Sequence, residues 1–447
     1  MLHISSAAKP LLLQFATAFT HPTFQRWRVL LLSAIVTTGR RTISNLLRTA
    51  RTVASGHPSS FHRVLSKRKW SMWKLARTLA AFILNRWLPS GLVSLAVDDT
   101  VDEHRGKQVY GKGCHREAVR STHSFTAYRW GHKWVVLSIL VKFPFALRPW
   151  ALPVLIALYR SREWNHQHRK RHRTPPVLAR QLVNVLRHWF PQRAFLLTGD
   201  GGFATHELAS FAQRHPSQVT LVSRFHPDAN LYEPPPRSNG KAGRPRLKGR
   251  KSPSPKEIVA RSTRQHLTVS WYGGGERRVE VVSAIGHWYR GGQGLVAVRW
   301  VFVHDLSGTH RDEYFFSTDP RMTPGHVIEA FTGRWSLEVT FEEMRSYVGL
   351  ETTRGRTEKT VLRAAPCLFG LYSVVTVLYA GLPARLRRSS LVAWAGKTHV
   401  TFSDAITAVR REVWKGWILE RGPNKAAFAK LPSRLRRALV EALAPAA

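Results

Sequence analysis

Two short apolar segments of this sequence each end in acidic residues, and this pattern restricts the fold more than any other feature. The first, LVSLAVDDTVDEH, carries Asp98 and Asp99, and the second, RAFLLTGDGGFAT, carries Asp200. Short apolar runs are typical of buried strands, and ligand-binding residues gather at the carboxyl ends of strands in an α/β sheet. We therefore expect neighbouring strand ends to place these acids on one metal ion. The alternative is that the acids only form turns.

A third acidic residue is expected on a helix covering residues 331–345, FTGRWSLEVTFEEMR. Thr323 is a suitable N-cap, and Pro324 suits the first helical position. At 3.6 residues per turn, an aromatic ring, two guanidinium groups and a carboxylate share one narrow stripe, where an ordinary core helix carries Leu or Val. The stripe consists of Phe331, Arg334, Glu338 and Arg345.

The net charge of +42, from 69 Lys and Arg against 27 Asp and Glu, predicts a polyanionic partner. Each Lys or Arg that neutralises a phosphate releases a counterion, so a nucleic acid is the expected partner. Apolar residues make up 43% of the chain, which indicates a folded protein. Two cysteines, Cys114 and Cys367, fit a reducing compartment. The most apolar windows, such as residues 368–382, fall short of a bilayer span, so we expect a soluble, cytoplasmic protein without a membrane partner.

Residues 1–90 are predicted to form a helical DNA-binding domain. Within it, TTGRRTISNLLRTAR (residues 37–51) places a glycine-containing turn before a basic helix, which resembles a helix-turn-helix. An ordinary helical hairpin would have the same pattern. A further helix should begin after Ser71. The residues available for phosphates or base edges are Arg40, Arg41, Asn45 and Arg48.

The stretch between the acids should contain a hairpin arm near residues 124–129, a strand in WVVLSILVKF, and helices at 153–159, 177–189 and 206–213. Cys114, His115, His123 and His132 could suggest zinc. Their spacing matches no tetrahedral site, so we expect these histidines to be solvated or to face phosphates.

Residues 226–256 are rich in Pro, Gly and basic residues, and we expect a loop without a packed core. The Gly-Arg-Pro-Arg run with Arg244 and Arg246 resembles an AT-hook, which lies in the minor groove; a basic surface loop is the alternative. Residues 267–317 alternate as antiparallel hairpins. A helical stretch at 361–382, interrupted at Pro366, and a basic helical tail from Arg385 complete the chain.

The three acidic positions together resemble those of the insertion-sequence DDE transposases of the retroviral-integrase superfamily, in the branch with a Tyr-x2-Arg-x3-Glu-x6-Lys signature. This chain has Phe331-x2-Arg334-x3-Glu338-x6-Arg345. Arg334 and Glu338 match; Phe331 lacks the tyrosine hydroxyl, and Arg345 keeps only the charge. The run Asp98-Asp99-Thr100 resembles the first-acid motif, and TGDGGF the second. The resemblance covers roughly residues 20 to 380.

This resemblance implies an RNase H-like fold: a mixed sheet flanked by helices, with an all-β insertion between the second and third acids. We accordingly expect a helical domain (residues 1–90), a catalytic domain in two parts (91–225 and 321–382), a basic loop and β-rich insertion between them (226–320), and a basic helical C-terminal region (383–447).

The resemblance also implies Mg²⁺, or Mn²⁺, held by Asp200, Glu338 and either Asp98 or Asp99. Arg334 and Arg345 would bind phosphates, Phe331 would contact DNA with them, and Trp288 or Trp300 would stack on an extruded base. The implied activity is cleavage of transposon ends in double-stranded DNA and joining of their 3′-hydroxyls to target DNA by a homodimer or higher multimer. The alternatives are a DNA-binding protein without catalysis and a nuclease of the same fold.

Overall fold

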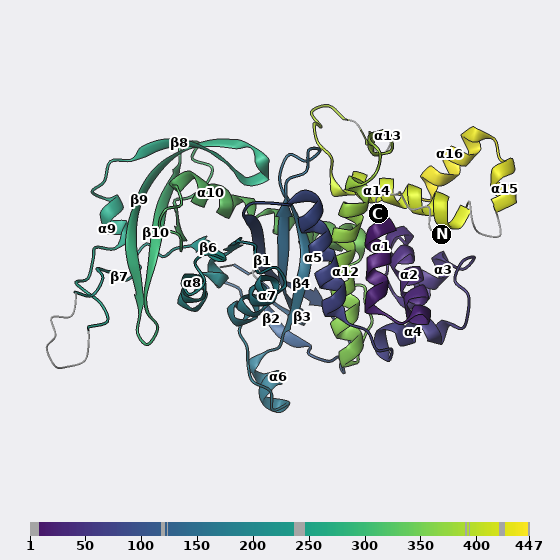
Figure 1. Ribbon diagram of the computed structural model, residues 1–447, viewed down its shortest axis with the longest axis horizontal. Coiled ribbons are helices and arrows are strands. Elements are labelled where there is room, and N and C mark those ends of the chain that lie inside the picture. Colours follow the sequence, from purple (N-terminus) through teal and green to yellow (C-terminus); the bar gives the residue numbers. More distant parts are fainter. Residues whose placement is uncertain are drawn as a thin grey trace.

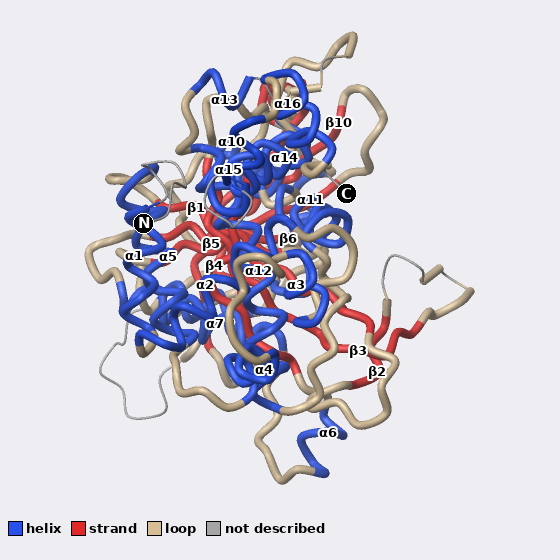
Figure 2. Tube along the Cα trace, turned by 90° about the vertical axis from the view of Figure 1, so that its right-hand side faces the viewer, coloured by secondary structure: helices blue, strands red, loops and turns tan. Residues whose placement is uncertain are grey.

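The computed structural model describes residues 9–117, 121–122, 124–236, 246–388, 391–392, 394–419 and 425–445. A mixed sheet runs through the molecule, with helices from the N-terminal and C-terminal parts of the chain gathered at one end and long antiparallel strands at the other (Figure 1). Turned by 90°, most strands lie toward the middle with helices on several sides, while β2 and the start of β3 extend to the lower right (Figure 2).

The central part of the sheet is formed by five strands in the order β4-β3-β1-β5-β6. Strand β3 is antiparallel to both β1 and β4, whereas β5 is parallel to β1 and β6 is parallel to β5. This is the predicted mixed sheet with the strand order of an RNase H-like fold. The strands are β1 (Val93–Glu103), β3 (Tyr128–Val141), β4 (Trp150–Tyr159), β5 (Phe195–Gly199) and β6 (Val219–Arg224).

The strands between the second and third acids continue the same sheet. Strand β11 pairs antiparallel with β6, β10 pairs with β11, and β9 pairs with β10. The predicted antiparallel hairpins are confirmed, and hydrogen bonding joins them directly to the central strands. These strands are β7 (Leu231–Tyr232), β8 (Gln265–Ser270), β9 (Glu276–Arg290), β10 (Gly294–Asp305) and β11 (Glu313–Ser317); α9 (Pro255–Val259) lies beside them.

Strand β4 corrects one prediction, because residues 153–159 are extended and not helical. A short, continuous apolar run is compatible with a buried strand or a buried helix, and periodicity cannot separate the two. Pro153 lies opposite Ser138, at an irregularity in the β3–β4 pairing. Such irregularities are where a strand accommodates proline, which has no N–H to donate. The predicted hairpin arm near residues 124–129 also needs correction, because the arm that pairs with β3 is β2 (Gly113–Arg116).

The N-terminal helices are α1 (Lys9–Phe15), α2 (His21–Val36), α3 (Ile43–Thr49), α4 (Pro58–Ser66) and α5 (Met72–Trp87). Ser71 caps α5 as predicted, since its side chain accepts a hydrogen bond from the Lys74 N–H. Other helices are α6 (Arg162–Gln167), α7 (Pro175–Trp189), α8 (His206–Gln213), α13 (Ala384–Arg388), α14 (Phe402–Val413), α15 (Lys425–Lys430) and α16 (Ser433–Ala442).

Helix α12 (Glu358–Ala380) is the long core helix. It continues through Pro366, so the predicted interruption was wrong. By length and composition this helix is also sufficient to cross a membrane, which corrects the expectation that no apolar window is long enough to do so. In this structure 78% of its most apolar window is buried inside the protein. Its Ser373 hydroxyl donates to the Pro153 carbonyl of β4, and its Phe369 ring contacts Trp134 of β3.

Candidate active site

Asp98 and Asp200 lie side by side at neighbouring positions of two parallel strands. Val97 of β1 is the partner of Gly199 of β5, so the residue that follows each of them is adjacent to the other and points to the same face. Asp200 also accepts a hydrogen bond from the Gly202 N–H at 2.9 Å. The turn-forming role and the site role of this aspartate are therefore compatible.

Asp99 points to the opposite face of β1, because successive side chains of a strand alternate. Its carboxylate forms an ion pair with Lys133 of β3 at 3.0 Å. The sequence left Asp98 and Asp99 as equal candidates, and this geometry separates them in favour of Asp98. Neither residue is at a strand end, since β1 continues to Glu103 opposite Gly131 of β3.

The third carboxylate comes from a helical segment that is broken where one continuous helix was expected. Helix α10 (Pro324–Gly333) begins at the predicted N-cap Thr323 and ends at Gly333; α11 (Ser336–Glu343) follows, and residues 344–348 form a π-helical turn. Around the break the Glu338 N–H bonds to the Trp335 carbonyl, three residues back, instead of four. The predicted continuous helix is therefore wrong at residues 334–335, where the chain winds more tightly between α10 and α11.

Arg334, at the break, joins two of the three carboxylates. One terminal nitrogen lies 3.2 Å from the Asp98 carboxylate, and the other lies 2.8 Å from the carboxylate of Glu338. The Arg334 side chain is only 6% exposed, whereas that of Glu338 is 46% exposed. Arg334 is therefore an internal counter-ion of the acids here, and its contact with DNA phosphates stays a prediction.

Burial dominates the electrostatics of Asp98 and raises its pKa to about 8. The Arg334 charge opposes this shift, and the charges of Asp200 and Asp99 add to it. The influence of Asp200 on Asp98 agrees with their neighbouring positions on β5 and β1. The site thus brings carboxyl groups together in a poorly solvated place, where a bound cation would favour their ionised form.

Phe331 was predicted to contact DNA, and this was wrong. Its ring is 0% exposed and stacks on Phe315 of β11, with centroids 4.2 Å apart. The Arg334 guanidinium lies 5.3 Å from the centre of the ring. Phe331 is consequently a core residue that supports the position of Arg334.

Arg345 connects the helical segment to the first-acid motif. Its guanidinium donates a hydrogen bond to the Thr100 hydroxyl and forms an ion pair with Glu351 at 3.1 Å. Thr100 is on the same face of β1 as Asp98. The residues of the Asp98-Asp99-Thr100 run and of the Arg-x3-Glu-x6-Arg run are thus joined at two points. Arg345 is partly exposed and can still meet a phosphate.

A family model described as "DDE superfamily endonuclease" matches residues 14–278. The chain belongs to the DDE superfamily of endonucleases. The match includes Asp98 and Asp200 and ends before Glu338, so the place of Glu338 rests on the geometry above. No curated protein matches the chain. Among solved structures, a piggyBac transposase synaptic complex with hairpin DNA is similar, with a TM-score of 0.40 and 10% identity over 99% of this chain and 82% of that one.

The donor set of this DDE protein suits a divalent metal of the superfamily, because three carboxylates supply only oxygen ligands. Among the described residues, however, Asp98, Asp200 and Glu338 do not form a group with all ligand atoms within 4.8 Å of one another. The Arg334 guanidinium stands between two of them. The residues therefore fit a metal in kind, and in this arrangement Arg334 is the cation that contacts two of them.

The residues predicted to bind DNA in the N-terminal region fall into two groups. Arg40 and Arg48 are exposed, and Asn45 is half-buried with its side chain donating to the Arg40 carbonyl. Arg41 is buried and donates to the Tyr347 carbonyl at 2.6 Å, so its predicted role as a DNA contact was wrong.

Two predictions further along the chain have different outcomes. Arg244 and the rest of the Gly-Arg-Pro run lie outside the described residues, while Arg246 is exposed. Trp300 is fully buried in the sheet, and Trp288 packs on Phe225 and Phe316. Neither tryptophan is presented for stacking on a base.

Exposed aromatic residues occur elsewhere and were missed. The exposed rings belong to the β2–β3 hairpin: Phe125 lies between the two strands, and Tyr128 and Trp130 are among the first residues of β3. Trp130 is 58% exposed, and the Lys112 ammonium lies 5.3 Å from the centre of its ring. The signal in the sequence was the mixture of aromatic and basic residues in residues 104–133, which could have been given more weight than its histidines.

Proposed function

We propose that this DDE protein is a transposase that cuts DNA at transposon ends and joins the 3′-hydroxyls to target DNA. The observation that carries the proposal is the alignment of Asp98 with Asp200 on adjacent parallel strands, with Glu338 linked to Asp98 through Arg334. Family membership supports phosphodiester chemistry, and the charge of +42 supports a DNA substrate.

In this proposal Asp98, Asp200 and Glu338 hold Mg²⁺, or Mn²⁺ in its place. When bound, two such ions would activate the attacking water or 3′-hydroxyl and stabilise the leaving oxygen. Arg334 keeps Asp98 and Glu338 compensated before metal binds. Lys133 holds Asp99 away on the other face, so Asp99 contributes no ligand.

The DNA surface proposed here combines basic and aromatic groups. Arg40, Arg48 and Arg246 are exposed cations, and Trp130 with Lys112 offers a ring and a charge at the β2–β3 hairpin. Aromatic rings beside cations suit unpaired bases at a nicked or opened DNA end, since stacking tolerates any base. A transposase acts on two ends at once, and we propose a homodimer or higher multimer on DNA.

The direct test compares matched carboxylate variants on a labelled duplex carrying a transposon end. We expect Glu338→Gln and Asp98→Asn to abolish Mg²⁺-dependent cleavage while DNA binding persists. Asp99→Asn is the control, because it removes a neighbouring carboxylate on the other face and should still cleave. Cleavage that survives Glu338→Gln, or that Asp99→Asn abolishes while Asp98→Asn does not, contradicts the proposed ligand set.

A second experiment separates a transposase from a nuclease of the same fold. A duplex end that already carries a free 3′-hydroxyl is supplied with a target plasmid and Mg²⁺. A transposase should produce covalently joined strands from this substrate. Cleavage of intact ends without any joining product would reject strand transfer and leave the nuclease.

A further inference from the structure

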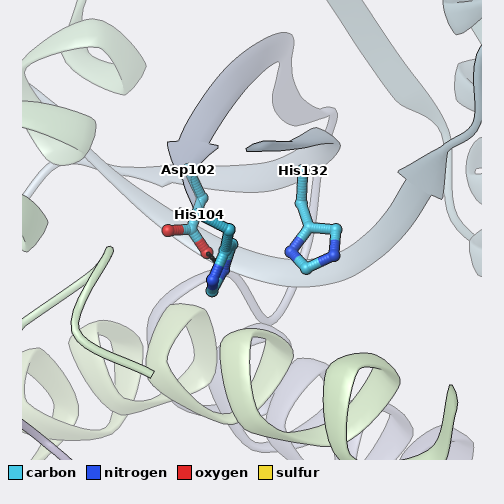
Figure 3. A group of neighbouring side chains, drawn as sticks. All are labelled: Asp102, His104 and His132. Carbon is cyan, nitrogen blue, oxygen red and sulfur yellow. Dashed lines mark hydrogen bonds and ion pairs between the residues drawn. The ribbon is translucent and has the colours of Figure 1, made fainter. Parts of the chain in front are cut away.

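We infer that Asp102, His104 and His132 form a zinc site separate from the catalytic carboxylates. All three are buried, and one ligand atom from each lies within 4.8 Å of the others (Figure 3). Asp102 and His132 are direct partners across β1 and β3, so their side chains share one face of the sheet. His104 follows the end of β1 and is bonded through its backbone N–H to the Trp130 carbonyl of β3.

The buried carboxylate of Asp102 is the reason why this site would bind a cation. Its side chain is 0% exposed, and Oδ2 lies 3.3 Å from Nε2 of His104. Its other oxygen, Oδ1, is buried and has no hydrogen-bond partner. A buried carboxylate oxygen without a partner is strongly unfavourable, and a bound metal ion removes that penalty.

The surroundings of His132 are those of a metal ligand. Its Nε2 lies 2.9 Å from the Tyr110 carbonyl, an acceptor to which it donates its ring N–H. This fixes the tautomer and leaves the lone pair of Nδ1 available, which is how backbone carbonyls orient metal-binding histidines. The rings of His104 and His132 are 4.4 Å apart, so small rotations bring both onto one ion.

The donor set selects zinc over the proposed catalytic metal. Two imidazole nitrogens and one carboxylate oxygen suit Zn²⁺, whereas Mg²⁺ prefers oxygen ligands alone. Asp102 is four residues beyond Asp98, about 13 Å along an extended strand, and the Arg345–Thr100 contact lies between them. An ion here would therefore be distinct from those held by Asp98, Asp200 and Glu338.

The position of the site explains what the ion would do. It would tie the end of β1 to β3 and, through His132, to Tyr110. Tyr110 in turn bonds to the Arg356 carbonyl through its backbone and to Glu358, at the start of α12, through its hydroxyl at 2.7 Å. The zinc would thus hold the strand that carries Asp98 against the segment that follows the Glu338 helix.

The test measures metal content in the purified full-length chain after dialysis against Mg²⁺ buffer without zinc. We expect one zinc per chain in the wild type and in Glu338→Gln, and loss of it in Asp102→Asn and His132→Gln. His115→Gln is the matched control, since His115 is also buried but lies on the opposite face beside Tyr159, and it should keep its zinc. Equal zinc in Asp102→Asn and wild type would overturn the proposal.

A second measurement keeps the test valid if the variants fold poorly. Wild-type protein stripped with a chelator is titrated with zinc and, separately, with Co²⁺, while its melting temperature and visible absorption are followed. We expect a raised melting temperature with zinc and the bands of a tetrahedral nitrogen and oxygen site with cobalt, both unchanged in Glu338→Gln. A wild type that contains no zinc and shows no shift on titration would refute the site, whatever the outcome for the proposed transposase activity.

Discussion

The guanidinium of Arg334 lies 3.2 Å from the carboxylate of Asp98, although the two residues are 236 positions apart in the chain. The contact fixes the α10–α11 break against β1 and so determines where Glu338 lies. When Asp98 is ionised, the same guanidinium balances its charge within the protein. Because burial raises the pKa of Asp98 to about 8, a metal ion that binds this carboxyl near pH 7 must also displace a proton.

Replacing Arg334 should reveal the effect of its guanidinium on Asp98 through the pH dependence of DNA cleavage. In Arg334→Ala the pKa of Asp98, already raised to about 8, should rise further, because burial remains and the opposing charge is gone. A protonated carboxyl binds metal poorly, so we expect cleavage to fall about 10- to 100-fold near pH 7, the range given by losing one or two charged hydrogen bonds. The loss should be smaller at pH 9, where more Asp98 is ionised. Cleavage rates across this pH range provide the measurement.

The opposite result for Arg334→Ala has a definite meaning. Tighter Mg²⁺ binding with undiminished cleavage would show that Arg334 competes with the metal and contributes nothing else. Arg334→Lys serves as the control for charge, since it keeps the cation but cannot contact both carboxylates in the same planar way.

Replacing the neighbouring residues Arg40 and Arg41 by alanine should have different effects on stability and on DNA binding. Arg41 is buried and shares the Tyr347 carbonyl with Arg410, so it joins the N-terminal and C-terminal regions to the turn after α11. We expect Arg41→Ala to lower the free energy of unfolding by about 1–3 kcal/mol, measured by denaturant unfolding. Arg40→Ala should leave stability unchanged and weaken DNA binding, with a shallower dependence on salt. A reversal of these two effects would contradict the assignment of their roles.

The fold could be predicted from the sequence in those segments whose local pattern, an apolar run or a helix cap, matches their place in the structure. The apolar runs before Asp98 and Asp200 gave two central strands, and the Thr323 cap gave the start of α10. The choice between Asp98 and Asp99 needed the register of β1 with β5, which no residue pattern encodes. The prediction of a helix at residues 153–159 failed because this apolar run is uniform, so only its partners in the sheet decide its conformation. The prediction for Arg41 failed because a buried arginine bound to backbone carbonyls has the same sequence signature as an exposed one.

The replacement of the family's tyrosine by Phe331 should affect stability and not DNA contact. Phe331 is enclosed and stacked on Phe315, so Phe331→Ala should cost about 3–5 kcal/mol through lost burial and a cavity. Phe331→Leu keeps most of the volume and should cost much less. Denaturant unfolding gives the stabilities, and DNA affinity at a temperature where both variants are folded should equal that of the wild type. A selective loss of DNA affinity in a stable Phe331→Leu protein would restore a direct contact for this position.

The two native cysteines allow the proposed DNA surface to be mapped by chemical modification, without introducing a further cysteine. Cys114 is exposed and lies opposite Trp130 in the β2–β3 pairing, whereas burial raises the pKa of the Cys367 thiol to about 12. Since the thiolate is the reactive form, iodoacetamide at pH 8 should modify Cys114 quickly and Cys367 very slowly. DNA bound at the Trp130 edge should slow the modification of Cys114 severalfold, and Cys114→Ser should remove the fast phase. If saturating DNA leaves the Cys114 rate unchanged, the β2–β3 hairpin is not part of the DNA surface.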